Sequence, residues 1–368
     1  MSDLNFKVSI ITVVYNGVAT IEQTIKSVLG QTYKNIEYIV IDGASTDGTQ
    51  LIIEKYIDDI FYYVSEKDEG LYYAMNKGLA KATGEIVGII NSDDWYDINA
   101  VKNMVECFNK SEAELVYGQT VVVAENGIEK ASEVGEIQTL WYKAPFRHPS
   151  VFVKKSVYDR FGGFDVNYVV AADYDLLLRF YSENIKFEYL DKVIAYFRLG
   201  GLSTKQRKLS YEENYNISMK YVERCLYKDK VIPKIKEIYE WACFSKETLK
   251  TDGMLYKLIC KYFNATINNL IIFGMGVWGK GCYMALSQET ITVSNFSDNN
   301  PEMWNTRFHG IKVINPDELK NMNVYVLIAV KEHADEIQNQ LKNMRNEELK
   351  YVSINELKEM FLRESSNE

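Results

Sequence analysis

The sequence predicts an α/β protein whose first part is a mainly parallel β-sheet flanked by helices. Strand and helix signals alternate through the first 100 residues, and a second alternation begins at about residue 268. Between them, residues 205–266 are rich in Tyr and Lys and carry a 3.6-residue period. We therefore expect an α/β domain over 1–204, a helical connector over 205–266 and a small α/β domain over 267–368.

Strands and helices are expected in strict alternation through residue 108. The β-branched run at 7–16 suits a strand that is buried on both faces. The helix expected next has apolar residues at helical spacing, and Thr20 and Gln23 form a capping box at its start. The further strands are expected at 35–43, 60–66 and 85–91, and the helices at 20–31, 49–57, 70–84 and 98–108. The last of these helices is expected to bury Ile98, Val101, Val105 and Phe108.

The pattern is mixed from about 115 to 200. Strands are expected at 115–124 and 148–154, followed by a helix at 174–184. Helical periodicity then covers 211–227 and 235–249. Aromatic and basic side chains in this connector suit either an interhelical core or docking at a membrane face. They are Tyr211, Tyr215, Lys220 and Tyr221.

The overall composition is that of an ordinary soluble globular protein. Apolar residues make up 47% and charged residues 25% of the 368, and the net charge of −9 provides no basic field for nucleic acid. The five cysteines have no paired spacing, which indicates reduced thiols in a cytoplasmic protein. The N-terminus lacks the pattern of a signal peptide, and no apolar run has the length of a membrane span.

Polar residues follow the first four expected strands, at 12–17, 42–49, 65–70 and 91–97. The carboxyl ends of parallel strands meet at one edge of a sheet, where ligands gather. Asp42 is suited to accept a hydrogen bond from a nucleobase or a ribose hydroxyl. Asp47 precedes Gly-Thr at a helix start, so helix capping and ligand contact are both open for it. These segments together predict a binding site.

Asp93 and Asp94 are adjacent carboxylates directly after the fourth strand. Hard divalent cations take carboxylate oxygens and use their free positions for phosphate oxygens. One carboxylate can bind the metal while the other contacts a ribose or a water. The alternative is an exposed acidic turn.

Residues 7–204 strongly resemble glycosyltransferase family 2. The segments that carry the resemblance are "VSIITVVYNGVATIEQTIKSVLGQTYKNIEYIVIDGASTDGT", "AMNKGLAKATGEIVGIINSDD", "HPSVFVKKSVYDRFGGFD" and "AADYDLLLRF", in that order. The resemblance implies a GT-A fold that binds a nucleotide-sugar. It also implies transfer of a sugar, usually with inversion and with Mg²⁺ or Mn²⁺.

The resemblance assigns site residues position by position. Asp94 is implied as the metal ligand, Asp93 as a ribose or sugar contact and Asp173 as the catalytic base. The remaining residues of the implied donor site are Val13, Tyr15, Asn16, Asp42 and Asp68. Two positions depart from the common family pattern, because Gly43 follows Asp42 and Ala172 precedes Asp173.

The residues themselves partly support Asp173 independently. Inverting transfer requires a carboxylate that takes the proton of the acceptor hydroxyl. A helix that begins near Asp173, with Leu176, Leu177 and Phe180 packed inward, would hold this group rigidly. Asp173 as a simple N-cap and Asp175 as a rival base stay open. Asp175 and Arg179 are spaced i, i+4, which predicts an ion pair on the helix surface.

Four further positions are candidate contacts. His148 suits the donor diphosphate or the metal, or a hydrogen-bonded loop position. Arg198 could reach phosphate, and the resemblance favours an active-site edge for it over a plain surface position. Gly163 lies in the stretch that resembles the family loop on the acceptor side. Trp95 suits stacking on the acceptor sugar or plain packing at the rim.

The last α/β segment contains Gly274, Gly276 and Gly279 in the G-x-G-x-x-G spacing after an apolar strand, with Asp298 following 19 residues later. These residues resemble a small Rossmann-like module with a nucleotide site. A strand-to-helix turn without a ligand uses the same glycines.

We therefore expect an inverting, metal-dependent glycosyltransferase with a UDP-sugar donor and a glycan or lipid-linked acceptor in surface polysaccharide synthesis. It would be cytoplasmic, in peripheral contact with the inner face of the membrane if the acceptor is lipid-linked. The alternative is a dinucleotide-binding oxidoreductase or a regulatory nucleotide-binding protein that acts through the last domain.

Overall fold

Two compact units make up the chain, Met1–Lys236 and Glu237–Glu368. The computed structural model describes residues 5–124, 127, 129–131, 134–201, 206–251 and 253–365. The division between the units falls inside the long helix α9 (Lys228–Leu249). The division into three parts with boundaries at 204 and 266 stays a prediction.

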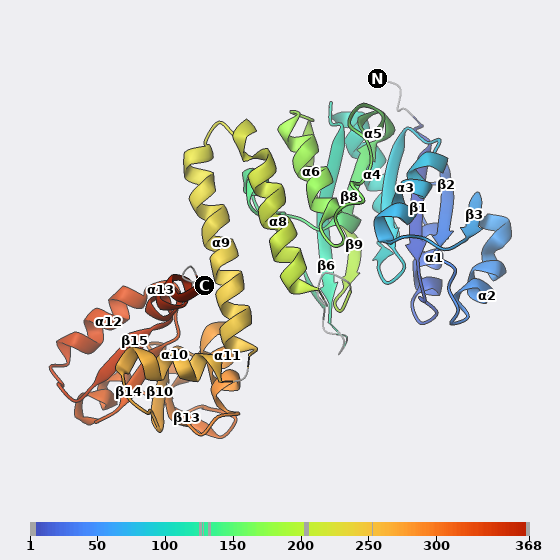
Figure 1. The fold of residues 1–368 in the computed structure, drawn as a ribbon. Coiled ribbons are helices and arrows are strands. Elements are labelled where there is room, and N and C mark those ends of the chain that lie inside the picture. Colours follow the sequence, from blue (N-terminus) through green and yellow to red (C-terminus); the bar gives the residue numbers. More distant parts are fainter. Residues whose placement is uncertain are drawn as a thin grey trace. The chain divides into compact units, whose positions relative to one another are not determined.

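In the described part of the first unit, nine strands form one mixed sheet (Figure 1). The order is β3-β2-β1-β4-β8-β6-β9-β5, and β7 pairs with β6. β1 to β4 run parallel, whereas β8 is antiparallel to β4 and β6. The α/β fold with a mainly parallel sheet is confirmed. The strands are β1 (Val8–Val14), β2 (Ile36–Asp42), β3 (Tyr62–Ser65), β4 (Ile86–Asn91), β5 (Trp95–Tyr96), β6 (Leu115–Val123), β7 (Glu129–Ala131), β8 (Val151–Lys154) and β9 (Phe187–Arg198).

Helices cover both faces of this sheet because a strand sends alternate side chains to opposite sides. Val8 and Ile10 of β1 pack with α1 and α4, whereas Ile11 and Val13 pack with α3, α6 and α8. The strand predicted to be buried on both faces is therefore confirmed. The helices are α1 (Ile21–Leu29), α2 (Thr49–Ile53), α3 (Leu71–Lys81), α4 (Ala100–Lys110), α5 (Lys155–Phe161), α6 (Ala172–Ser182) and α8 (Arg207–Tyr221), with 3-10 turns η1 (Glu54–Asp59), η2 (Ile137–Trp141), η3 (His148–Ser150) and η4 (Val222–Arg224).

Two local expectations in this unit are wrong. The Thr20 side chain makes no cap and instead donates a hydrogen bond to the carbonyl of Gly17. Ile98 is 51% exposed because α4 begins only at Ala100, so Ile98 lies before the helix rather than on its buried face.

Helix α8, predicted as part of a connector, packs into the core of the first unit. Its Ile217 and Tyr221 are buried in the same apolar cluster as α3 and α6. For Tyr221 the interhelical core is therefore the observed environment. Tyr211 is exposed, at 38% of its surface.

In the described part of the second unit, six strands form a sheet in the order β12-β13-β11-β10-β14-β15. All pairs except β12–β13 are parallel, and the first strand, β10, lies near the middle. The strands are β10 (Asn269–Phe273), β11 (Thr292–Ser297), β12 (Arg307–Phe308), β13 (Ile311–Ile314), β14 (Tyr325–Ile328) and β15 (Lys350–Ser353); the helices are α10 (Met254–Phe263), α11 (Val277–Leu286), α12 (Ala334–Asn343) and α13 (Ile354–Ser365), with 3-10 turns η5 (Pro301–Met303) and η6 (Pro316–Asn321).

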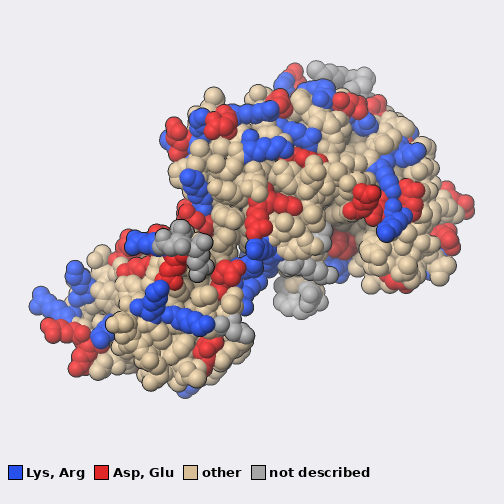
Figure 2. Space-filling view, in the orientation of Figure 1, with Lys and Arg blue, Asp and Glu red and all other residues tan. Residues whose placement is uncertain are grey.

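Acidic and basic side chains are interspersed on the face of the molecule that Figure 2 shows. This mixture agrees with the net charge of −9, and the visible face has no broad basic field. Within the described residues, no helix is both long enough and apolar enough to cross a bilayer.

Candidate functional site

The carboxyl ends of the first four strands lie side by side. The register aligns Val14 of β1 with Asp42 of β2, and Asp42 with Ser65 of β3. On the other side of β1, Val13 is aligned with Asn91 of β4. The sheet edge therefore gathers the polar segments as the sequence predicts.

The loop after β1 is tied to the loop after β2. Asn16, in left-handed conformation (φ 53°), donates its N–H to Ser45 Oγ at 2.7 Å and accepts from Thr46 N at 2.9 Å. Tyr15 is 68% exposed, whereas Val13 is 3% exposed in the core, so the predicted donor contact of Val13 stays a prediction.

The Asp42 carboxylate is fully buried and hydrogen-bonded inside the protein. It accepts from Ser45 and Ser65 hydroxyls and from Gln50 Nε2 at 3.3 Å. Asp47 accepts from the N–H groups of Thr49 and Val18, both at 3.0 Å. Asp47 thus steadies the start of α2, and the Asp42 nucleobase contact stays a prediction.

Asp68, in the segment after β3, forms an ion pair with Lys77 of α3 at 2.5 Å. The Asp68 side chain is 7% exposed, and its Oδ2 has no partner among the described residues. Asp68 Oδ2 is thus a buried carboxylate oxygen without a hydrogen bond from the described residues.

Asp94 is buried at the end of β4, with 1% of its surface exposed. Its Oδ1 accepts the backbone N–H of Arg198 at 2.9 Å, while its Oδ2 has no partner among the described residues. Burial and the charge of Asp93 raise the pKa of Asp94 well above the usual range. A carboxylate in this environment is stabilised by a cation placed at Oδ2.

These features fit a divalent cation held by one protein carboxylate. Mg²⁺ commonly uses one or two carboxylates together with substrate phosphates and water. Within the described residues, no three His, Cys, Asp or Glu side chains cluster as a complete protein-only metal site. A cation at Asp94 would therefore depend on a phosphate ligand to complete its coordination.

Arg198 and Trp95 flank the aspartate pair. Arg198 Nε donates to the Asp93 carbonyl at 3.2 Å, and its guanidinium lies 5.1 Å from the Trp95 ring. Trp95 stacks on Tyr196 with ring centroids 5.1 Å apart. Gly201 follows in the same loop, close to Asp93 Oδ2. Trp95 is thus part of an aromatic and cationic stack at the rim.

Arg147 and His148 connect the Asp94 side of the site with the Asp173 side. Burial lowers the pKa of Arg147, and the charge of Asp94 acts in the opposite direction. Burial also lowers the pKa of His148, against the charge of Asp173. The lower pKa favours the neutral imidazole of His148, and these two consecutive residues lie within electrostatic reach of the two acidic positions.

Asp173 lies in the first turn of α6, as predicted, and not at the N-cap, which is Ala171. Its Oδ1 accepts the Tyr174 N–H at 2.9 Å and lies 3.5 Å from the Tyr72 hydroxyl. Burial raises the pKa of Asp173, and the charge of His148 opposes this rise. The geometry gives Asp173 a raised proton affinity, which suits a general base.

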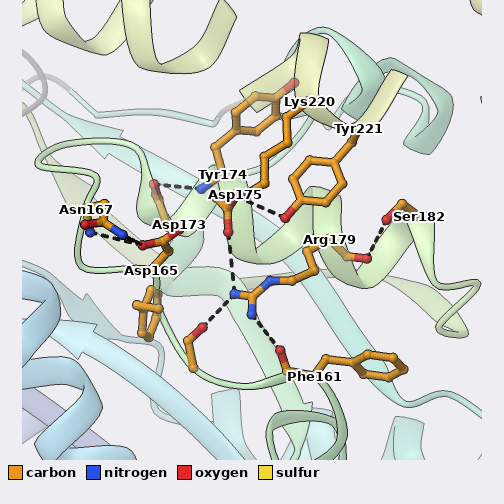
Figure 3. Close-up of polar contacts among 12 residues, drawn as sticks. Phe161, Asp165, Asn167, Asp173, Tyr174, Asp175, Arg179, Ser182, Lys220 and Tyr221 are labelled. Atoms are coloured by element: carbon orange, nitrogen blue, oxygen red, sulfur yellow. Dashed lines mark hydrogen bonds and ion pairs between the residues drawn. The ribbon is translucent and has the colours of Figure 1, made fainter. Parts of the chain in front are cut away.

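Asp175 lies in a different environment from Asp173 (Figure 3). Its exposed fraction is 1%, and it accepts from Lys220 Nζ at 2.9 Å and from the Tyr221 hydroxyl at 3.1 Å. The predicted ion pair with Arg179 is present at 3.5 Å, but it is buried rather than on the surface. The correction arises because α8 covers this face of α6.

The loop that contains Gly163 is held from two sides. Arg179 donates to the carbonyls of Phe161 and Gly163, both at 2.6 Å. Asn76 of α3 pairs with the backbone of Phe164 at 2.8 and 2.9 Å. A Cβ on Gly163 would lie 2.3 Å from Asn76 Oδ1, so the close approach requires glycine. The fixed loop places Phe164 against Tyr72 and His148.

The glycine turn of the second unit is closely packed. Gly274 has φ +106°, and a Cβ on Gly279 would lie 1.8 Å from the Gly274 carbonyl. Asp298 accepts the Met275 N–H at 2.8 Å, so the predicted residues do come together. Gly276 has open space where a Cβ would be.

Comparison with known proteins identifies the family of the first unit. The model described as Glycosyl transferase family 2 matches residues 9–167. The glucosyltransferase WfaP of Escherichia coli is 30% identical over 205 residues, which are 55% of this chain and 80% of that protein. An uncharacterized glycosyltransferase of Mycobacterium tuberculosis is 31% identical over 177 residues, 47% of this chain and 68% of that protein. The chain belongs to glycosyltransferase family 2.

Solved structures of glycosyltransferases share the fold. TarS of S. aureus, residues 1–349 with UDP-GlcNAc, superposes with a TM-score of 0.55 at 20% identity, and the match covers 67% of this chain and 76% of that TarS fragment. The mannosyltransferase PcManGT of Pyrobaculum calidifontis, with GDP-Man and Mn²⁺, gives 0.53 at 18% identity, with 70% and 80% covered. The predicted GT-A fold is confirmed for this family 2 chain. A second family model, described as C2185-like, N-terminal, matches residues 266–352.

Proposed function

We propose that this glycosyltransferase transfers a sugar with inversion from a UDP-sugar to a hydroxyl of a glycan or lipid-linked acceptor. WfaP is named for a UDP-glucose donor and a diphosphoundecaprenol-linked acceptor, and other relatives are named for PGL/p-HBAD biosynthesis. These names support a role in surface polysaccharide synthesis. A lipid-linked acceptor would bring the protein to the inner face of the membrane.

The single observation that carries the proposal is the Asp94 carboxylate. It is buried at the end of β4 with Oδ2 unpartnered among the described residues. Asp94 would hold Mn²⁺ or Mg²⁺, which when bound neutralises charge on the leaving diphosphate. Arg147 and Arg198 would supply further positive charge to the same group.

Asp173 would take the acceptor proton. The acceptor oxygen attacks the anomeric carbon, the bond from that carbon to the diphosphate oxygen breaks, and the hydroxyl proton moves to Asp173. This single displacement inverts the anomeric configuration. The raised pKa of Asp173 supports the assignment, because a base with higher proton affinity removes a hydroxyl proton more effectively.

The donor contacts follow from the same edge of the sheet. Asp68 and the loop at Tyr15 and Asn16 would contact the nucleoside. Asp93 would contact a ribose or sugar hydroxyl. His148 would act as a hydrogen-bonding group toward the diphosphate. Trp95 with Tyr196 offers a flat surface for the acceptor sugar.

The test combines binding with turnover. In calorimetric titrations of the full chain, UDP is expected to bind at least tenfold more weakly in EDTA than with Mn²⁺. Asp94→Asn with Mn²⁺ is expected to bind UDP as weakly as the wild type does in EDTA. UDP release from a panel of UDP-sugars is expected to stop in Asp173→Asn, whose UDP affinity stays at the wild-type level. Equal UDP affinity in chelator, or normal turnover of Asp173→Asn, would refute the proposal.

A second candidate function concerns the glycine turn of the second unit. The open space at Gly276 supports regulatory nucleotide binding there, because a phosphate can approach such a backbone closely. Mass spectrometry of the native protein is expected to detect a nucleotide that Gly276→Val loses. An oxidoreductase would instead be favoured if the protein has an activity that depends on a bound dinucleotide and that Asp94→Asn does not abolish.

A further inference from the structure

The N-terminal end of the Asp173 helix is held by a carboxylate from another helix. Glu213 of α8 accepts the N–H of Val169 through Oε1 at 2.8 Å. Its Oε2 accepts the N–H groups of Val170 and Ala171 at 3.0 and 2.9 Å. The Glu213 side chain is only 8% exposed. Three consecutive backbone donors therefore converge on one buried carboxylate, 42 to 44 residues away in sequence.

This contact fixes the segment that enters the helix, because its donors are the N-cap N–H and the two N–H groups before it. Helix α6 begins at Ala172, and its N-cap residue Ala171 has no side chain that can cap. A buried carboxylate that accepts several N–H groups is strongly fixed, because charge-assisted hydrogen bonds are stronger than neutral ones. Glu213 therefore fixes the three residues that lead into the helix, and Asp173 follows two residues after Ala171.

Three more polar contacts join the same helices. The Tyr174 hydroxyl is 2.8 Å from Ser218 Oγ, and Asp175 accepts from Lys220 and Tyr221 as Figure 3 shows. The residues on either side of Asp173 are thus tied to α8. The Asp173 side chain itself points away from these ties toward Tyr72 and His148.

We propose that Glu213 is a positioning residue for the catalytic base. By holding residues 169–171 it sets the direction in which Asp173 meets the acceptor hydroxyl. The role rests on the proposed function, in which Asp173 is the base. The donor groups Asp68 and Asp94 belong to other segments, and in the described part of the chain neither is hydrogen-bonded to Glu213. Glu213 is therefore expected to act on transfer and not on donor binding.

The chain offers a matched pair of variants on one helix. Glu213→Gln keeps the shape of the side chain but replaces one carboxylate oxygen with an amide NH₂ group. At least one backbone N–H of residues 169–171 therefore loses its acceptor. Glu212→Gln removes the neighbouring carboxylate, whose ion pair with Lys208 at 3.6 Å is on the surface. Glu213→Asp keeps the charge on a shorter side chain and tests conservative rescue.

The assay measures kcat and KM for UDP release with the turned-over UDP-sugar, and Kd for UDP with Mn²⁺. Calorimetric stoichiometry counts the folded molecules of each variant. Glu213→Gln is expected to lower kcat about 10- to 100-fold per folded molecule, since small misplacement of a reacting group has effects of this size. Its KM and Kd are expected to stay within about twofold, with Glu213→Asp intermediate and Glu212→Gln at the wild-type rate.

Hydrogen exchange and a double variant complete the test. Amides of 169–171 are expected to exchange at least tenfold faster in Glu213→Gln, while those of β1 are unchanged. Adding Glu213→Gln to Asp173→Asn is expected to lower kcat no further. A wild-type kcat in Glu213→Gln, a parallel loss of UDP affinity, or an additive double variant overturns the positioning role.

The two proposals can fail separately. Wild-type turnover of Asp173→Asn refutes the base and with it the role of Glu213. An inactive Asp173→Asn beside a fully active Glu213→Gln refutes only the role of Glu213. If Glu213→Gln yields no folded protein, the Glu213→Asp result decides, because unchanged kcat with accelerated exchange at 169–171 contradicts the proposal.

Discussion

Replacement by asparagine should affect different properties at the two aspartates in the first turn of α6. Asp175→Asn removes a charge that is 1% exposed and that pairs with Lys220 at 2.9 Å and Arg179 at 3.5 Å. Asp173→Asn removes a charge that burial disfavours, as its raised pKa indicates. Stability should therefore depend on Asp175, and turnover on Asp173.

The magnitude follows from the contacts. Removing one partner from a buried ion pair costs about 3–5 kcal/mol. The value for Asp175→Asn is lower, because the Lys220 side chain is 46% exposed, the Arg179 distance is long, and the amide oxygen can keep the Tyr221 bond. We expect about 2–3 kcal/mol, or roughly 5–10 °C in Tm for a unit of this size. Asp173→Asn is expected to leave Tm unchanged or slightly raised.

Scanning calorimetry and UDP release, measured on the same preparations, check both halves. Below its melting temperature, Asp175→Asn should keep at least about a third of wild-type kcat, whereas Asp173→Asn should lose on the order of a thousandfold. The reasoning is refuted if Asp175→Asn melts like wild type, or if it loses turnover as completely as Asp173→Asn while its UDP affinity is normal. The second result would make Asp175 the base.

Three further predictions concern acid stability, the pH profile and the glycine turn. Burial raises the pKa of Glu37, but hydrogen bonds from Lys7, Ser9 and Thr83 outweigh it and lower the pKa to about 2. The charged Glu37 contributes its full stabilisation above its unfolded pKa of about 4.5, and this contribution is lost as the pH falls toward 2. In Glu37→Gln, the free energy of unfolding from denaturant titrations should therefore depend less on pH over this range. As the pH falls, kcat/KM should begin to drop at a pH above the usual carboxyl pKa, because burial raises the pKa of Asp173. UDP binding measured over the same pH range is the control. A drop centred near pH 3.8 would contradict this prediction. Gly279→Ala should destabilise the second unit by about 1–3 kcal/mol in calorimetry, because its Cβ would meet the Gly274 carbonyl. Gly276→Ala should not destabilise it, because a Cβ there has nothing within 4 Å. Equal losses of stability in the two variants would contradict the packing argument.

Local sequence patterns predicted the fold class and the sheet edge well. Alternating apolar runs identified β1 to β4, and the parallel arrangement then required their polar ends to meet. The placement of Asp94 at such an end is a local property, and its burial follows from the strand before it. Asp173 in the first turn of a helix was likewise readable, because the helical period of Leu176, Leu177 and Phe180 is confirmed.

The contacts that shape the site from outside could not be read in this way. The surface ion pair predicted for Asp175 and Arg179 is buried because α8, 45 residues later, brings Lys220 onto it. Tyr72 gives no sequence signal, since an aromatic residue in a helix usually indicates packing. Arg147 had one weak signal, a basic residue directly before His148. Glu213 had none, because a glutamate in a charged helix is typical of a solvated surface.

The dependence of the site on α8 leads to a last prediction, about where the catalytic unit ends. The core around α6 includes six buried apolar residues beyond 204, and they are Ile217, Tyr221, Val222, Cys225, Val231 and Ile235. Burial of six such side chains contributes on the order of 10 kcal/mol, which is comparable to the whole stability of a domain. Truncation after residue 204 would also leave the Asp175 charge buried without Lys220.

A chain of residues 1–204 is therefore expected to lack a cooperative thermal transition and UDP binding, whereas a chain of residues 1–236 keeps both. Circular dichroism melting and calorimetry with UDP and Mn²⁺ distinguish the two. A cooperatively folded 1–204 chain with wild-type UDP affinity would show that α8 is dispensable for the fold. If the longer chain folds and the shorter one does not, the segment after 204 belongs to the catalytic domain. It supplies both the missing part of the core and the Lys220 ammonium group that pairs with Asp175.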